Sequence, residues 1–128
     1  MKKLVVAALA SLAALGLPAG VAQANDADVI REGSCSANSD WKLKLSPENG
    51  RIEIEFEVDQ NVVGQVWDVV IRDNGNVVFT GQRTTVAPSG SFEVRRVVTN
   101  LAGDDRVVAR ATNVQTGEVC RGVATATF

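Results

Sequence analysis

A set of arginines in the C-terminal part of the chain could recognise anions. Its members are Arg83, Arg95, Arg96, Arg106, Arg110 and Arg121. A guanidinium group binds a carboxylate or a phosphate through two parallel hydrogen bonds. We therefore expect a cationic patch that binds an anionic polymer of the cell envelope or an acidic partner protein. The alternative is that these arginines lie on solvated strand faces, neutralised by Glu93, Asp104 and Glu118.

Residue types that are missing exclude several classes of catalytic site. The chain has no His and two Cys, which excludes a Ser-His-Asp triad, a Cys-His pair, any zinc site with histidine ligands and a site of four thiolates. We expect no cofactor, no metal and no enzymatic activity. Residues 25–80 are acidic and residues 81–128 are basic. A nucleic-acid-binding protein would be more uniformly basic, so no nucleic acid is expected as a partner.

Carboxylates alternate along one predicted strand, at Glu53, Glu55 and Glu57. We interpret them as a solvated face that pairs with Lys42 and Lys44. The alternative, a small carboxylate-based hydrolase, needs an acid whose pKa is raised by burial, and no buried acid is expected.

Two other groups of oxygen ligands fall in predicted turns. Asp73–Asn76 is too short for a calcium-binding loop of 12 residues. Asp104 and Asp105 are predicted to lie in a loop, with a weak Ca²⁺ contact as the alternative.

The two cysteines, Cys35 and Cys120, lie near the two ends of the expected mature chain. An exported chain with an even, small number of cysteines pairs them. A bridge across this long loop would stabilise the fold by about 4–5 kcal/mol. Two free thiols or an intermolecular bridge are the alternatives.

Residues 1–24 have the pattern of a secretory signal peptide. Lys2 and Lys3 precede the apolar run Leu4–Leu17, and Ala22–Ala24 supplies small residues for cleavage. The run is shorter than the ~20 residues of a spanning helix, although a membrane anchor is the alternative. We expect export by the Sec route, cleavage after Ala24, and a secreted domain at residues 25–128 without a membrane span.

Alternating apolar and polar residues over Trp41–Val58 predict a β-hairpin. A four-residue turn at Pro47–Gly50 would place Leu43 opposite Ile54. One face of the hairpin would then be apolar and the other would be a ladder of opposite charges.

A second hairpin is predicted from Val66–Arg72 and Val77–Thr80, because Asn-Gly lies between the two apolar runs. Either Val78 or Phe79 lies opposite Ile71, depending on a bulge at Gly75, and we expect Phe79.

Later segments also alternate apolar and polar residues, as β-strands do. In Ser91–Val98 the adjacent Arg95 and Arg96 interrupt the alternation, which indicates a β-bulge or a crossing between sheets. Arg106–Thr112 and Glu118–Thr125 form a last predicted hairpin.

With a first strand near Val29–Ser34, the chain has seven or eight short strands and no helical period. This spacing predicts an all-β fold, an antiparallel immunoglobulin-like β-sandwich. The disulfide would join its first and last strands. Trp41 and Trp67 occupy inward positions and are expected in the core. An up-and-down barrel is the alternative.

Short motifs around the cysteines add a resemblance. Gly33–Ser36 with Trp41–Lys44, and Asn113–Arg121, resemble small exported actinobacterial proteins of unknown function with an immunoglobulin-like β-sandwich. The resemblance implies a similar fold and location and transfers no catalytic or binding residue. Because these residues assemble no nucleophile–base pair, metal site, cofactor loop or buried acid, we expect a secreted, non-catalytic binding protein. The alternative is a secreted inhibitor of an extracellular hydrolase that presents the loop Ala87–Gly90 or Asn100–Asp105.

Overall fold

The computed structural model describes residues 27–128. The expected signal peptide, residues 1–24, lies outside the described residues. Within residues 27–128 no helix is long and apolar enough to cross a bilayer.

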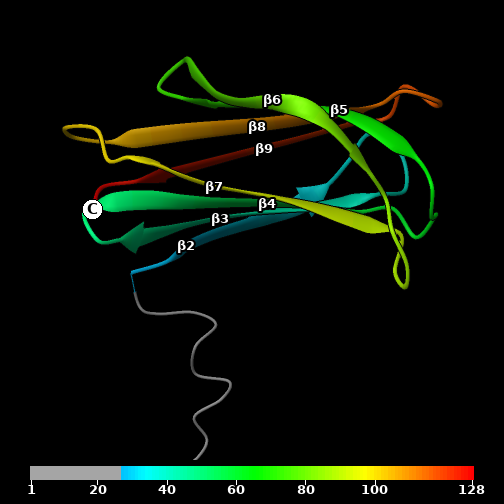
Figure 1. Cartoon of the computed structure of the whole chain (residues 1–128), viewed down its shortest axis with the longest axis horizontal. Coiled ribbons are helices and arrows are strands. Elements are labelled where there is room, and N and C mark those ends of the chain that lie inside the picture. The colour runs from blue at the N-terminus through cyan, green and yellow to red at the C-terminus, as the bar shows by residue number, and fades with distance from the viewer. Residues whose placement is uncertain (1–26) are drawn as a thin grey trace, which may run out of the picture.

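Residues 27–128 fold into two packed antiparallel sheets (Figure 1), which confirms the predicted immunoglobulin-like sandwich. One sheet has the strand order β2-β3-β4-β7 and the other has the order β6-β5-β8-β9. The bounds are β2 Val29–Ser34, β3 Asp40–Glu48, β4 Arg51–Asp59, β5 Val66–Asp73, β6 Asn76–Thr84, β7 Ser91–Thr99, β8 Asp105–Asn113 and β9 Val119–Ala126. The chain changes sheets after β4, β6 and β7, so residues distant in sequence become neighbours across each sheet.

The β3–β4 hairpin has the predicted faces but a different register. Its turn is the pair Asn49–Gly50, both with positive φ, which is the two-residue turn that suits the twist of a hairpin. Leu43 therefore lies opposite Phe56 rather than Ile54. A shift of two residues keeps every side chain on its expected face. Pro47 lies in β3 beyond Leu45, the last β3 residue that pairs with β2. No β2 carbonyl therefore lacks a donor because proline has no N–H.

The β5–β6 hairpin closes at Asn74–Gly75, and Phe79 lies opposite Ile71 as predicted. The irregularity in its ladder falls between Ile71 and Arg72, not at Gly75.

The interruption predicted at Arg95 and Arg96 is absent. Strand β7 pairs with β4 without a shift, with Arg95 opposite Glu55 and Arg96 opposite Ile54. Arg96 occupies an inward position, but β7 is an edge strand, so its side chain stays exposed at the open side of the sandwich. An edge position thus accommodates a charge that the interior of the sheet would exclude.

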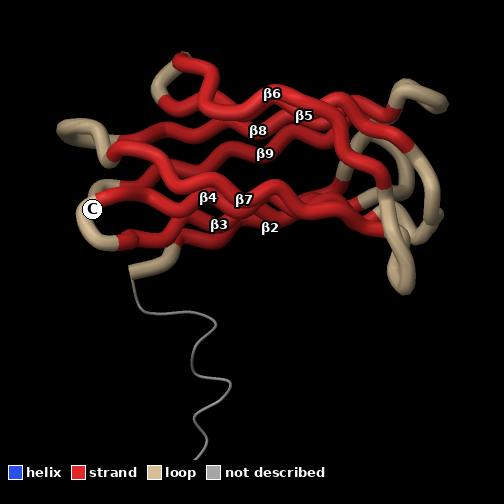
Figure 2. Tube along the Cα trace, in the orientation of Figure 1, coloured by secondary structure: helices blue, strands red, loops and turns tan. Residues whose placement is uncertain are grey.

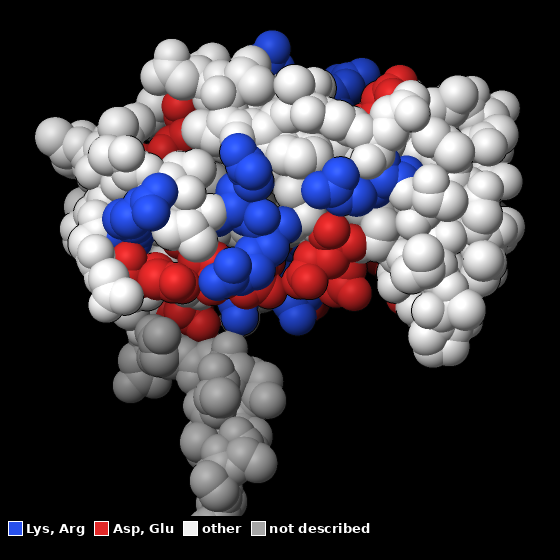
Figure 3. Space-filling model, in the orientation of Figure 1, with Lys and Arg blue, Asp and Glu red and all other residues white. Residues whose placement is uncertain are grey.

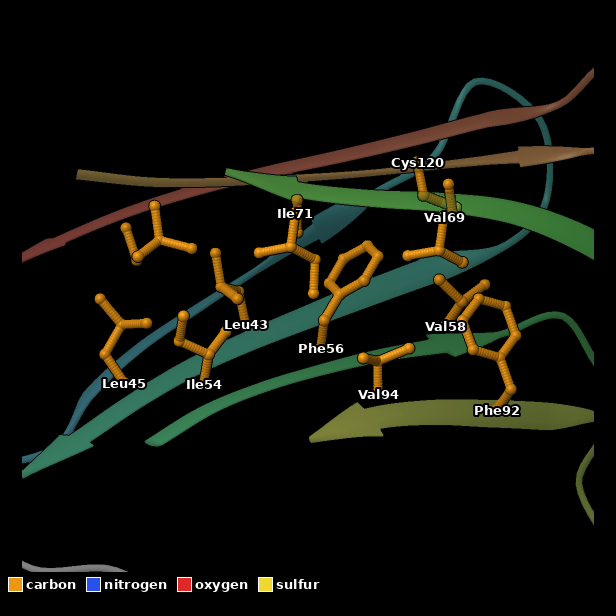
Figure 4. Close-up of a cluster of buried hydrophobic side chains, with 14 of the residues drawn as sticks. Leu43, Leu45, Ile54, Phe56, Val58, Val69, Ile71, Phe92, Val94 and Cys120 are labelled. Atoms are coloured by element: carbon orange, nitrogen blue, oxygen red, sulfur yellow. The ribbon is translucent and has the colours of Figure 1, made fainter. Parts of the chain in front are cut away.

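The core lies between the sheets, where inward side chains of both sheets meet (Figure 4). Phe56 projects from β4 toward Ile71 and Val69 of the opposite sheet. Trp67 is fully buried as predicted, with its Nε1 donating to Oε1 of Gln60 at 3.0 Å. Burial of such aromatic side chains supplies much of the apolar area that stabilises a small domain.

Trp41 is half-buried and closes the β2–β9 side of the core. A Cβ added to Gly33 or Gly122 would lie within 3.0 Å of its indole ring. The two glycines thus let the ring lie directly against the backbones of β2 and β9.

The same side carries the predicted disulfide. Cys35, directly after β2, is bonded to Cys120 of β9, with a Cα–Cα distance of 4.3 Å. The Ser36 N–H also donates to the Val119 carbonyl at 2.8 Å. The first and last strands are therefore joined covalently and by hydrogen bonds.

Candidate anion-binding face

Three of the predicted arginines come together on the outer face of the β6-β5-β8-β9 sheet. Arg106 and Arg110 alternate along β8 with buried residues, and Arg121 does so along β9. Arg110 lies directly opposite Arg121 in the β8–β9 ladder. Two like charges at paired positions destabilise a sheet, so this pair costs stability unless an anion neutralises it.

A fourth arginine on this face was not predicted. Arg72 of β5 is exposed and lies opposite Val108 of β8. The sequence did contain a signal for it, because Arg72 directly follows the inward Ile71 in an alternating strand and therefore faces outward. We call Arg72, Arg106, Arg110 and Arg121 the arginine face. Half-buried valines lie between these arginines on the same face, namely Val70, Val108 and Val123.

The arginine face has little negative charge of its own. Asp68 is the acid of the outward positions on β5, and its Oδ1 accepts a hydrogen bond from Gln82 at 2.8 Å. Among residues 27–128, the ion pairs do not include any member of the arginine face. Its four guanidinium groups can therefore bind an external anion without first breaking an internal ion pair.

Arg83 and Arg96 lie elsewhere, on the open side between β6 and β7. Both guanidinium groups approach the ring of Phe79, with Cζ-to-centroid distances of 4.8 Å for Arg83 and 5.8 Å for Arg96. In cation–π contacts of this kind the cation covers the face of the aromatic ring. These two arginines thus have a packing role that the sequence did not indicate.

Arg95 is neutralised on the opposite sheet. Its guanidinium group forms ion pairs with Glu53 and with Glu48. Lys44 pairs with Glu55 at 3.7 Å on the same outer face, as expected for the strand glutamates, although Glu53, Glu55 and Glu57 are half-buried and not fully solvated. The predicted arginines therefore do not share one surface.

The outer face of the β2-β3-β4-β7 sheet is acidic. Figure 3 shows acidic side chains along this lower sheet, with basic side chains across the middle and at the top of the view. A hollow of about 450 Å³ on this face is lined by Glu32, Gly33, Ser34, Asp40, Trp41, Lys42, Glu57 and Asp59. Burial, followed by a hydrogen bond to Glu55, raises the pKa of the nearby Glu93. Within the described residues no group of three or more candidate ligands could hold a metal ion.

One pair of acids is buried, contrary to expectation. Asp73 and Asp105 face inward at the end of the sandwich near the Asn74–Gly75 turn and are 2% and 0% exposed. Burial, then a hydrogen bond to Asp105 and its charge, raises the pKa of Asp73 to about 7. Oδ1 of Asp73 and Oδ2 of Asp105 are buried and accept no hydrogen bond from another residue. A proton on Asp73 lets this side chain donate a hydrogen bond to the Asp105 carboxylate. Neither carboxyl lines the acidic hollow.

The two loops considered for an inhibitor lie at opposite ends of the molecule. Ala87–Gly90 precedes β7 and Asn100–Asp105 follows it. Strand β7 is nine residues long and extended, and it lies between the two loops. The two loops therefore cannot form one contact surface.

Comparisons of the chain with protein-family models, with curated proteins and with solved structures find no match.

Proposed function

We propose that this protein is a secreted, non-catalytic binding protein whose arginine face binds an anionic polymer of the cell envelope. The observation that carries the proposal is an outer sheet face with four arginines that form no ion pair with any of residues 27–128. The export pattern at residues 1–24 and the disulfide support an extracellular location.

The placement of the arginines favours a polymer with repeated anionic groups. They are distributed over β5, β8 and β9, so one extended chain crossing the strands can contact several of them in turn. The Arg110–Arg121 pair offers two adjacent guanidinium groups to one phosphate or carboxylate, and bidentate binding makes such contacts strong. Valines between the arginines can cover the apolar parts of the polymer.

The proposal is tested by measuring binding of the exported protein to polyphosphate and to polyglutamate, with neutral dextran as the reference. We expect binding to both polyanions that weakens with salt, because bound cations are released when arginines neutralise the polymer. The double variant Arg110→Gln/Arg121→Gln should lower affinity at least ~10-fold and reduce the salt slope by about two.

The matched control is Arg83→Gln/Arg95→Gln, which removes the same charge from the other two surfaces. It should change affinity by no more than about twofold. Equal losses in both double variants would show attraction by overall charge and refute a specific face. Absence of binding to either polyanion would refute the polymer and leave an acidic protein as the candidate partner.

A further inference from the structure

The outer face of the β2-β3-β4-β7 sheet places acids directly opposite one another. Asp40 pairs with Asp59 in the β3–β4 ladder. Glu57 pairs with Glu93 in the β4–β7 ladder, and like charges at paired positions destabilise a sheet. The repulsion is visible at Glu93, whose pKa is raised by burial, by a hydrogen bond to Glu55 and by the charges of Glu55 and Glu57. We call Asp40, Glu57, Asp59 and Glu93 the acidic patch.

The acidic patch is not neutralised by neighbouring bases. Among residues 27–128, the ion pairs do not include any of its four acids. Lys42 adjoins the patch, but it lies in the sheet between Glu57 of β4 and Glu32 of β2, so Glu32 offsets its charge. Three acids of the patch line the hollow of about 450 Å³ together with Lys42 and Glu32. The hollow therefore keeps a net negative charge that is open to positive side chains of another molecule.

The arginine face has a matching arrangement of opposite sign. Arg110 and Arg121 are partners in the β8–β9 ladder, just as two glutamates of the acidic patch are partners in the β4–β7 ladder. Side chains at paired positions start about 5 Å apart, so each guanidinium group of one pair can meet one carboxylate of the other. Two further charges of the same sign lie on one side of each pair, namely Arg72 and Arg106 beside the arginines and Asp40 and Asp59 beside the glutamates.

The acidic patch and the arginine face lie on opposite sides of the sandwich, because they belong to the outer faces of its two sheets (Figures 1 and 2). They therefore cannot meet within one molecule. The acidic patch of one copy can lie on the arginine face of the next copy, and this contact places an opposite charge beside each like-charge pair. Each added copy leaves one acidic patch and one arginine face free at the two ends, so growth does not stop at two copies.

We propose that copies of this protein associate head to tail, with the acidic patch of one copy on the arginine face of the next. Four strands about 4.8 Å apart and about nine residues long cover roughly 19 by 30 Å, so each partner buries at most roughly 570 Å². Contacts of that size are weak, and we expect a dissociation constant of roughly 100 µM at low salt. A second copy and an anionic polymer would compete for the arginine face, but the inference does not depend on polymer binding.

The test is sedimentation velocity of the exported protein without any polymer, from about 1 µM to about 1 mM, a range that brackets the expected dissociation constant. At low salt the average mass should rise with concentration beyond that of two copies. Raising the salt from about 10 mM to about 150 mM should weaken association at least ~10-fold, because the Debye length shortens from about 30 Å to about 8 Å.

Two double variants identify the two surfaces in contact. Arg110→Gln/Arg121→Gln neutralises the centre of the arginine face, and Glu57→Gln/Glu93→Gln neutralises the paired glutamates of the acidic patch. Each should weaken self-association at least ~10-fold. Both variants remove a like-charge pair, so neither should destabilise the fold. In an equimolar mixture, the intact acidic patch of the first variant can meet the intact arginine face of the second. The mixture should therefore form dimers and no larger species.

The matched control is Arg83→Gln/Arg96→Gln, which removes two arginines from the open side of the sandwich. It should change the association constant by no more than about twofold. A monomer at every concentration at low salt would overturn the proposal, as would a mixture of the two variants that stays monomeric. Growth of the wild-type protein that stops at two copies would show a closed contact and overturn it as well. Binding to polyanions is measured separately, so either proposal can fail while the other stands.

Discussion

Replacing Asp73 by asparagine should make the protein more stable above neutral pH. The pKa of Asp73 is raised from 3.8 to about 7, so between these values the folded chain holds a proton that the unfolded chain has released. The folded state then binds more protons, and its stability falls as pH rises from about 4 through about 7. Each pKa unit corresponds to about 1.4 kcal/mol, so a rise of about three units sets an upper limit of about 4 kcal/mol.

The asparagine amide can donate to the Asp105 carboxylate as the protonated carboxyl does, but it does not titrate. Asp73→Asn should therefore match the wild-type protein near pH 4 and exceed its free energy of unfolding by about 1–4 kcal/mol near pH 8. Urea unfolding followed by the fluorescence of Trp41 and Trp67 measures this difference. Asp40→Asn removes an exposed carboxyl from β3 and serves as the control.

The result that would refute this reasoning is a constant difference between wild type and Asp73→Asn across the whole range from about pH 4 to about pH 8. A constant offset would mean that Asp73 enters the folded state already ionised. The same conclusion would follow if Asp40→Asn changed the pH dependence as much as Asp73→Asn.

Two further predictions concern the closed side of the sandwich. Cys35→Ala/Cys120→Ala should lower the free energy of unfolding by about 4–5 kcal/mol, because the bridge closes a separation of 85 residues; a loss below about 1 kcal/mol in urea unfolding would contradict the loop-closure argument. Gly122→Ala should cost about 1–3 kcal/mol through overpacking, since its Cβ would lie 2.7 Å from the Trp41 ring. In a double-mutant cycle Trp41→Leu should remove most of that cost, and additive losses would show that the ring is not the obstacle.

Much of the fold could be predicted because strand alternation is a local property. The inward positions of Leu43, Phe56 and Trp67 follow from a period of two, and each of them is buried. The register was less certain, because it depends on how many residues the turn uses. Asn49–Gly50 alone forms the turn, so the partner of Leu43 moved by two residues without changing its face.

The candidate site was predicted only in part. Arg106, Arg110 and Arg121 were identified by residue type and do share a face, whereas Arg83, Arg95 and Arg96 do not join them. Their separation follows from strand order, since β6 and β7 are edge strands of different sheets. The arginine content of a segment carries no information about which sheet the segment joins.

The sequence alone determined the side chains that face inward, the pairing of Cys35 with Cys120, and the absence of histidine chemistry. Each of these depends on residue types or on neighbours within one strand. The tertiary structure decided that Arg72 of β5 lies on the same face as Arg106 and Arg110 of β8, and that Asp73 meets Asp105 in the interior. Those groupings depend on where the chain crosses between sheets, and crossings are set by packing between residues far apart in the sequence.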